Sequence, residues 1–481
     1  MSNHLDITVL QNLLKQVLLR VSDLEEENEK LRTENEALSA QNKILWAQNE
    51  ELHTRLNKNS TNSHRPPGSD GMRKKTALPR GKNVNNGGQP GHKGNTLKAV
   101  ATPDIIELHH APACSCCQKV FEAADVKRIS KTRQVFDIPQ PRMQVTEHRL
   151  GVIECCGITH EGTFPLEAAA AVQYGHRLKA LVTLLNVQYR MPLEQIQDLM
   201  DDLFDCPINE SSIIAATEKC AEVLQEVEAD LKAAILQSPV AHFDETGTRC
   251  AGKLHWVHVA CTYLVTYLYV HPKRGGEAFT TPASVFKDYT GYAVHDCWHS
   301  YFSHNPSTHI LCNAHILREL HALNEKGREW SQQMSALIMR LYQQSKTQPL
   351  DASQKATIEA EYDQICAHAD SLEPPPVKSP RGKAKSTPGR NLLNRLRTYR
   401  QAIITFAFDP SVPFTNNQAE RDIRNVKVKQ KVAGAFRTLN GAQIYARIQS
   451  FVSTTRKQKQ NTFQQLCRLL NGHTYVFNVR G

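Results

Sequence analysis

The feature that most constrains the fold is a heptad repeat from Leu10 to Leu56. Apolar residues recur every seventh position, and a second series that contains four successive asparagines alternates with them at spacings of three and four. The first series is Leu10, Val17, Leu24, Leu31, Leu38, Leu45 and Leu52, and the second is Leu14, Val21, Asn28, Asn35, Asn42, Asn49 and Leu56. This pattern predicts a leucine-zipper coiled coil over residues 8–57.

The asparagines in this repeat indicate which helices pair. A seam asparagine weakens helix pairing, but it hydrogen-bonds best to an identical residue in register on a partner helix. The sequence therefore favours a parallel homodimer. The alternative is a helical hairpin within one chain, although no matching second heptad run lies nearby.

Length and charge limit the class of protein. The chain has 481 residues and a formal net charge of +10, and a chain of this length holds roughly two to four domains. The positive charge is concentrated in patches, which favours a polyanionic partner over a small acidic substrate. Neither an apolar run long enough to span a membrane nor a signal peptide is evident, so we expect a cytoplasmic protein with no membrane partner.

The segment 58–98 has the composition of a flexible basic linker. It holds seven glycines, four prolines and nine lysines or arginines against the single acid Asp70, so it cannot bury a core. Two roles stay open, a simple tether and a contact with DNA phosphates that does not read the sequence.

Cysteines define the next segment, 99–170. Five of the thirteen cysteines lie between positions 114 and 156, which favours a metal cluster in a reducing compartment over a disulfide framework. The expected ligands of a structural Zn²⁺ ion are Cys114, Cys117, Cys155 and Cys156. Because Cys155 and Cys156 are adjacent and His148 and His160 are near, the fourth ligand stays open, as does the alternative of buried free cysteines. The runs 135–139 and 143–153 between the pairs read as strands.

Residues 171–237 show apolar positions three and four apart, which predicts a helical domain. Pro192 is expected to open one helix, and Pro207 separates two helices over 192–217. The spacing is that of a helix-turn-helix that binds DNA. The second helix carries almost no arginine or lysine, so an ordinary packed bundle is the alternative.

Two acidic residues each end a short apolar run. Asp244 follows the run 240–243, Gly247 is expected to turn the chain, and strand-like runs follow at 254–262 and 263–271. This pattern predicts a β-meander that carries Asp244. Asp296 follows the second apolar run, 292–295.

The third candidate acid, Glu420, lies near the start of a predicted basic helix. Thr415 and Gln418 fit a capping box, which predicts a helix that carries Glu420 in its first turn. Basic residues follow Glu420 along one helical face, and they suit contact with a phosphate backbone. These residues are Arg424, Lys427 and Lys431. The alternative is a surface pair between Glu420 and Arg424. The preceding segment 324–412 reads as a helical and basic insertion that contacts nucleic acid, because residues 373–400 hold eight lysines or arginines and one acid.

Motifs along the whole chain resemble one family. The phrases FDETGTR, KRGGEAF, GYAVHDCWHSYF, LCNAHILREL and FTNNQAERDIRNVKVKQKVAGAF occur in this order, and they look like the DDE transposases of the insertion sequence 66 family. The zipper, NSTNSHRPPGSDG, GGQPGHKGNTL and the cysteine module resemble the same family. One departure is the second cysteine pair, which reads Cys-Cys-Gly where the family pattern implies CxxC before a glycine.

The resemblance implies a ribonuclease-H-like α/β catalytic domain with a helical insertion. Asp244 would lie on its first strand, Asp296 after its fourth, and Glu420 on a following helix. These carboxylates would bind two Mg²⁺ ions, with Asp244 bridging. Water would first cut the transposon end, and the resulting 3′-OH would then attack target DNA. Small accessory proteins of the same element and association with the nucleoid are further expectations.

Several side chains near these acids have weaker assignments. Arg421, together with Arg424, Lys427 and Lys431, is expected to bind DNA phosphates, as are Lys273 and Arg274 from a loop. Glu245 should point to the opposite strand face from Asp244 and act structurally. The remaining candidates, each assigned to packing rather than to metal or base binding, are Cys312, His315, Trp298 and Tyr301.

The expected architecture is therefore multidomain α+β. Its parts are a coiled coil (8–57), a basic linker (58–98), a zinc module (99–170), a helical domain (171–237), a first catalytic part (238–323), an insertion (324–412) and a C-terminal catalytic part (413–481). Two other classes remain open. A nuclease or resolvase of the same fold would cut DNA without joining it, and a non-catalytic accessory protein would bind DNA without using the three acids.

Overall fold

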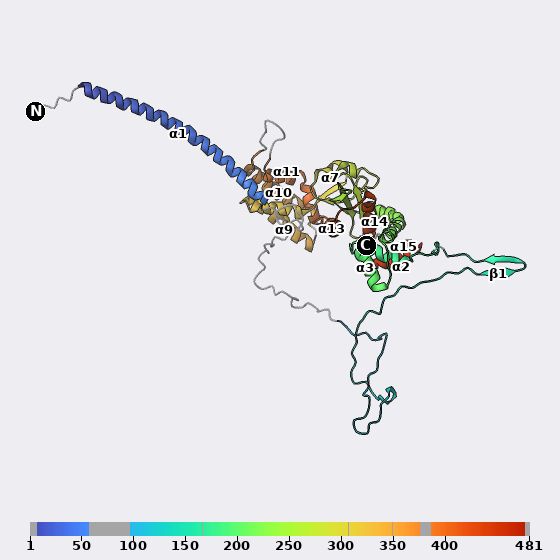
Figure 1. Cartoon of the computed structure of the whole chain (residues 1–481). Helices are drawn as coiled ribbons and strands as arrows, with labels where there is room; N and C mark the ends of the chain where they lie inside the picture. The colour runs from blue at the N-terminus through green and yellow to red at the C-terminus, as the bar shows by residue number, and fades with distance from the viewer. Residues whose placement is uncertain are drawn as a thin grey trace. The chain divides into compact units, whose positions relative to one another are not determined.

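The computed structural model describes residues 7–56, 97–165, 167–305, 307–348, 350–375 and 386–476. The fold is mixed α+β (Figure 1). The chain divides into two compact units, of which the first comprises Lys74–Ala293, His299–Ser307 and Asn417–Gly481 and the second comprises Met1–Arg73, Val294–Trp298 and Thr308–Asn416. The predicted basic linker falls almost wholly outside the described residues.

Helix α1, Ile7–Leu56, is one unbroken helix of 50 residues (Figure 1). A hairpin within this segment is therefore excluded. The seam residues Leu24, Leu31 and Leu38 are 43, 53 and 52 % exposed in the single chain. They form an apolar row that a second helix could bury. None of the helices in the described ranges combines the length and the apolar character that a membrane span requires.

The cysteine segment contains one short hairpin. Strands β1, Val152–Cys155, and β2, Ile158–Glu161, pair antiparallel, and Cys156 and Gly157 at the turn both have positive φ. The strands predicted at 135–139 and over most of 143–153 are wrong. Val135 and Val145 are each 90 % exposed, so nothing packs on these runs, and an extended segment without a packed face or a partner is not a stable strand.

Four helices follow, and the first three share an apolar core. They are α2 (His176–Val187), α3 (Leu193–Phe204), α4 (Glu210–Val223) and α5 (Gln225–Leu236). Val182, Ile196 and Ile213 are completely buried in this core. As predicted, Pro192 opens α3 and lies directly before its first residue. The backbone N–H groups at the start of a helix have no acceptor within the helix, so a proline there costs no hydrogen bond.

A five-stranded sheet, with strand order β5-β4-β3-β6-β7, carries Asp244 on one strand, and Asp296 directly follows another. Its strands are β3 (Val240–Cys250), β4 (Lys253–Cys261), β5 (Thr266–His271), β6 (Tyr292–His295) and β7 (Thr308–Leu311). The first three form the predicted antiparallel meander. The turn at Gly247 was wrongly predicted, because Gly247 pairs with Trp256 inside β3 and the chain turns at Ala251 and Gly252, whose φ angles are 49° and 75°.

Two helices from the C-terminal part pack on this meander. Helix α14, Leu439–Lys457, lies against β5, and α13, Asn417–Ala433, lies against β3 and β4. Helix α13 begins after Asn416, so Thr415 is not its N-cap as the capping-box pattern predicted. The short helix α15, Thr462–Leu470, contacts α2, α4 and α14 and connects this part to the helical domain.

Short helices and aromatic rings complete the first unit. Helices α6, Gly276–Phe279, and α7, His299–His304, contact one another. Phe243 of β3 meets Phe286 edge-on, with ring centroids 4.9 Å apart, and Phe286 also meets Tyr301 of α7 at 5.2 Å. This aromatic core lies directly beside the strand residue Asp244.

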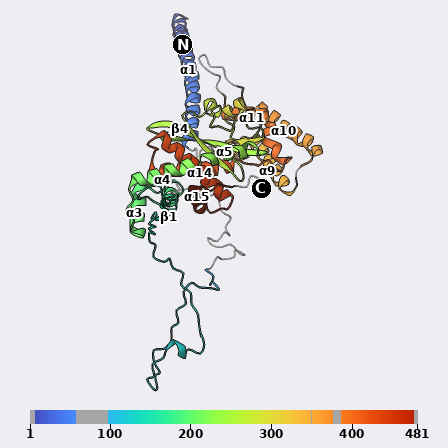
Figure 2. The ribbon, with the colours of Figure 1, turned by 90° about the vertical axis from the view of Figure 1, so that its right-hand side faces the viewer.

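The second unit is mainly helical. Besides α1, its α-helices are α8 (Asn313–Asn324), α9 (Glu329–Thr347), α10 (Ala352–Leu372), α11 (Pro388–Thr398) and α12 (Arg400–Ile404). Helix α10 lies beside both α9 and α11 (Figures 1 and 2). The long helices predicted after residue 324 are confirmed. Buried Glu373 accepts hydrogen bonds from Trp330 Nε1 at 3.1 Å and Thr387 Oγ1 at 3.0 Å, and this contact fastens the start of α11 to the end of α10. The basic residues 376–385 lie outside the described ranges.

Candidate active site

Asp244 lies on β3, the first strand of the five-stranded sheet in chain order. Its neighbour Phe243 points into the aromatic core, and Asp244 is only partly buried. One carboxylate oxygen, Oδ1, accepts a hydrogen bond of 2.9 Å from the backbone N–H of Glu245. The strand therefore holds Asp244 in a fixed position with its side chain partly accessible.

Asp296 directly follows β6, the fourth strand, which is the neighbour of β3 in the sheet. Its Oδ1 accepts a hydrogen bond of 3.0 Å from the backbone N–H of Trp298. The preceding residue, His295, is fully buried, and burial lowers the pKa of its ring to about 3. His295 shares a hydrogen bond of 2.8 Å with His309 on β7, so this histidine pair supports the backbone next to Asp296.

Glu420 lies in the first turn of α13 and is partly buried. The same helix is fastened to β3 at its other end, where Lys427 Nζ donates to the carbonyl of Gly247 at 2.6 Å and Gln430 Nε2 donates to Thr248 Oγ1 at 2.6 Å. Helix α13 and the strand that carries Asp244 thus form one packed pair.

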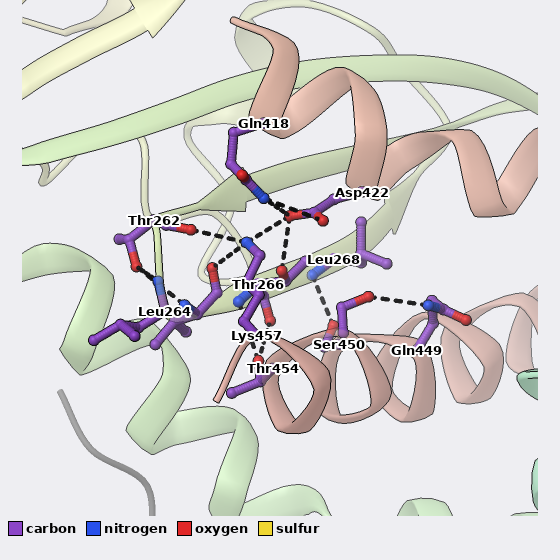
Figure 3. A network of polar contacts seen from close by, with 12 residues as sticks. Thr262, Leu264, Thr266, Leu268, Gln418, Asp422, Gln449, Ser450, Thr454 and Lys457 are labelled. Atoms are coloured by element: carbon purple, nitrogen blue, oxygen red, sulfur yellow. Dashed lines mark hydrogen bonds and ion pairs between the residues drawn. The ribbon is translucent and has the colours of Figure 1, made fainter. Parts of the chain in front are cut away.

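A buried polar network holds the first half of α13 (Figure 3). Asp422 Oδ2 accepts a hydrogen bond of 2.8 Å from Thr266 Oγ1 on β5, and it forms an ion pair of 2.6 Å with Lys457 Nζ on α14. Lys457 also donates to the carbonyls of Thr262 and Val265. The one sign of this network in the sequence is Asp422, an aspartate among the basic residues of this helix.

The edge of the sheet is covered by the same helix that carries Lys457. Thr454 Oγ1 and Ser450 Oγ of α14 accept hydrogen bonds from the backbone N–H groups of Thr266 and Leu268, at 3.1 and 2.8 Å (Figure 3). Side-chain hydroxyls therefore satisfy edge N–H groups of β5 that would otherwise attract another strand.

Glu245 has a structural position. Its side chain is 1 % exposed and forms an ion pair of 2.6 Å with Arg274, while Tyr301 donates a hydrogen bond to its other oxygen. The Arg274 guanidinium also lies 5.0 Å from the ring centroid of Trp256. Arg274, which was expected to hold a DNA phosphate, is thus engaged by a buried carboxylate, whereas Lys273 is exposed.

The basic residues of α13 divide into two groups. Arg421, Arg424 and Lys431 are exposed, and they stay candidates for phosphate contact. Lys427 is also exposed and stays a candidate, but its Nζ donates to the carbonyl of Gly247, and desolvation lowers its pKa.

The four candidate zinc ligands do not form one cluster. Cys114 begins a tight turn in which its carbonyl accepts a bond of 3.0 Å from the N–H of Gln118, and the sulfur atoms of Cys155 and Cys156 lie 3.7 Å apart. Across the described ranges, no group of three or more potential metal ligands includes these cysteines.

Helices α3 and α4 lie where a helix-turn-helix was considered. Both helices use their apolar faces to pack with α2, and the side chain of Lys219, the one cation in α4, pairs with Glu222 at 2.9 Å. The helices therefore form part of a packed bundle, and a role in reading DNA stays a prediction.

Comparison with known protein families covers most of the chain. Residues 171–444 match the model described as "Transposase IS66 family", and residues 16–98 match that of a family of unknown function, DUF6444. No curated protein is similar enough to match. The first match includes the helical domain, the sheet with Asp244 and Asp296, and the helix with Glu420, and it spans more than half of the 481 residues. The chain therefore belongs to the IS66 family of transposases.

Proposed function

We propose that this transposase uses Asp244, Asp296 and Glu420 as a DDE triad that cleaves and joins DNA. The observation that carries the proposal is the order of the acids on the fold. Asp244 is on the first strand, Asp296 follows the neighbouring fourth strand, and the helix of Glu420 packs on β3. This order agrees with the ribonuclease-H-like domain that the resemblance implies.

The donor atoms of the three residues fit Mg²⁺. All are carboxylate oxygens, which are the ligands that Mg²⁺ prefers. When bound, a pair of such ions would activate the oxygen that attacks the phosphate and would stabilise the oxygen that leaves it. Asp244, held on its strand, would bridge both ions, Asp296 would bind one, and Glu420 the other.

The protein's own residues would orient the DNA. Exposed Arg421 and Arg424 follow Glu420 on α13, so their guanidinium groups would bind phosphates on either side of the reacting bond. Lys431 and Lys273 would add further phosphate contacts. Because each contact releases counterions, the affinity for DNA should fall steeply with salt.

Two further parts of the proposal concern assembly. Helix α1 would pair with α1 of a second chain and bring two active sites to the two ends of one element. The cysteine segment would bind a structural Zn²⁺ through Cys114, Cys117, Cys155 and Cys156, which requires the two cysteine pairs to come together. Small accessory proteins of the same element, and association with the nucleoid, belong to the same proposal.

Product analysis tests the proposed reaction. Labelled DNA with the ends of the element is incubated with the protein and Mg²⁺, and joined and cleaved products are separated by gel. Joined product supports a strand-transferring transposase. Cleavage without joining would favour a nuclease or resolvase, and binding with neither product, even with accessory proteins added, would favour an accessory role.

A further inference from the structure

The loop between α13 and α14 follows one edge of β3 to the tip of the β3–β4 hairpin. Phe436 of this loop forms a parallel bridge to β3. Its N–H donates to the carbonyl of Arg249 at 2.9 Å, and its carbonyl accepts from the N–H of Ala251 at 3.0 Å. Earlier on the same edge, Lys427 Nζ donates to the carbonyl of Gly247 at 2.6 Å. The end of α13 and the loop are thus fixed along β3.

The bridge determines where two arginines project. Cys250, the partner of Phe436, is 1 % exposed, and the ring of Phe436 lies 5.4 Å from that of Tyr445 on α14. Successive side chains of an extended chain point to opposite sides. Arg249 and Arg437, the neighbours of this inward pair, are both exposed. From the spacing of paired strands, their Cα atoms are about 8 Å apart.

No carboxylate of the two segments balances these charges. Residues 246–276 and residues 423–481 contain neither aspartate nor glutamate. In the part of the chain that the structure describes, Arg249 and Arg437 form no ion pair with a carboxylate, whereas exposed Arg340 pairs with a glutamate. An exposed basic surface that lacks acids favours a polyanionic partner.

Helix α13 and strand β3 lead in step from the candidate active site to this surface. Lys427 lies seven residues after Glu420 on the helix, and its partner Gly247 lies three residues after Asp244 on the strand. Both separations are about 10 Å, so Glu420 and Asp244 lie at the same level. Arg249 is five residues, or about 17 Å, farther along the strand than Asp244. This is the length of about five base pairs of duplex DNA.

We propose that Arg249 and Arg437 hold the phosphate backbone of duplex DNA about five base pairs from the reacting bond. A guanidinium group binds phosphate oxygens through parallel N–H donors. Arg249 Nη1 donates to the carbonyl of Gly252 at 3.0 Å, which orients the group at the hairpin tip. Such contacts supply affinity and position the duplex without reading bases. The inference rests on the proposed function, because it takes DNA as the substrate and Asp244 and Glu420 as the reacting site.

Salt-dependent DNA binding by the full-length protein tests the two contacts. The affinity for a duplex with an end of the element is measured over a range of salt concentrations for wild type, Arg249→Gln, Arg437→Gln and the double variant. Each single change should reduce the slope of log affinity against log salt by about 0.9, and the double variant by about 1.8. Arg437→Lys keeps the charge and should keep the slope. Arg340→Gln, an exposed arginine that pairs with Glu361, is the matched control and should also keep it.

Uncharged phosphates locate the contact on the DNA. Duplexes that carry one methylphosphonate, which has no charge, are prepared with this group at successive positions. Wild type should lose affinity when the phosphates about five base pairs from the reacting bond are replaced, and the double variant should not respond there. Both proteins should respond alike at the other positions.

Three results would overturn the inference. A wild-type slope in either single variant would break the proposed pair. A double variant that keeps the wild-type response to every methylphosphonate would place the contact elsewhere. Loss of strand transfer at protein concentrations that saturate the DNA would assign the arginines to the reaction and not to binding. Wild type that binds no DNA would contradict the proposed function, and this inference with it. Exposed Arg437 keeps the test valid should Arg249→Gln, which loses the bond to Gly252, not fold.

Discussion

The carboxylate of Asp422 and the ammonium of Lys457 form a buried ion pair of 2.6 Å that joins α13 to α14. Asp422 lies two residues after Glu420, so the pair fixes the turn of the helix that carries the proposed third metal ligand. Lys457 also binds the loop before β5 through two backbone carbonyls. The pair thus ties the candidate site to the edge of the sheet.

Removal of one partner of this pair should be costly. Asp422→Asn leaves the Lys457 charge buried without a counter-charge, and the free energy of unfolding should fall by about 3–5 kcal/mol, as for other broken buried pairs. Urea unfolding measures this change. Lys219→Gln, which breaks the exposed pair with Glu222, is the control, and its effect should stay below about 1 kcal/mol.

The same variant also tests whether the pair positions Glu420. Asp422→Asn should raise the Mg²⁺ concentration for half-maximal strand transfer, because a helix turn that moves carries its metal ligand with it. A destabilised variant with an unchanged Mg²⁺ midpoint would limit the pair to a structural role.

Two glycines of the β3–β4 hairpin should respond differently to alanine. Gly252 has a φ of 75°, where a Cβ is strained, so Gly252→Ala should lower the free energy of unfolding by about 1–2 kcal/mol. Gly247 lies in the strand, and a Cβ there would meet Leu254 Cδ1 at an ordinary 3.4 Å. Gly247→Ala should be close to neutral. Thermal unfolding of both variants checks this, and the opposite ranking would contradict the observed turn.

His258 should make the protein less stable in acid. Burial lowers the pKa of this ring to about 4, below its ordinary value, so between about pH 6.5 and pH 4 the unfolded chain binds a proton that the folded chain does not. The contribution of His258 to stability is therefore fully present above pH 6.5 and falls by at most about 1.4 kcal/mol per pH unit below it. Urea unfolding from pH 7 to pH 5 measures the slope. His258→Gln should reduce the slope by up to about 1.4 kcal/mol per pH unit and leave the part due to His295, whose pKa burial also lowers. His255→Gln, on the same strand but partly exposed, should leave the slope unchanged.

Dimerisation should depend on the leucine row of α1. Leu31→Lys with Leu38→Lys places charge on the seam and should give a monomer in sedimentation velocity. Thr33→Lys with Ala37→Lys adds the same charge on other faces of the same helix, where both residues are exposed, and should leave a dimer. A wild-type monomer would show that α1 does not form the proposed coiled coil.

Much of the fold could be predicted from local patterns. The heptad repeat predicted α1, and the apolar runs predicted the strands β3, β4 and β5. Such patterns are informative because the spacing of apolar residues shows which face of a helix or strand is buried. The turn was predicted at Gly247 but lies at Ala251 and Gly252. A glycine inside a strand cannot be told from a turn glycine until the pairing register of the strands is known.

The site was predictable only in part, for a physical reason. Asp244, Asp296 and Glu420 each stand at the end of an apolar run or at the start of a helix, so local pattern and family resemblance both mark them. The partners Asp422 and Lys457 lie on different helices, and Arg249 and Arg437 come from segments far apart in the chain. Only tertiary packing brings such pairs together, and one sequence carries no local sign of it.

The most direct test of the account is strand transfer by carboxylate variants. Asp244→Asn, Asp296→Asn and Glu420→Gln are compared with wild type on labelled DNA in Mg²⁺, with the exposed acids changed in Asp288→Asn and Glu277→Gln as controls. The account predicts that all three triad variants bind DNA but form no joined product, while both controls join DNA as wild type does. Joined product at the wild-type level from any one of the three would contradict the proposed triad.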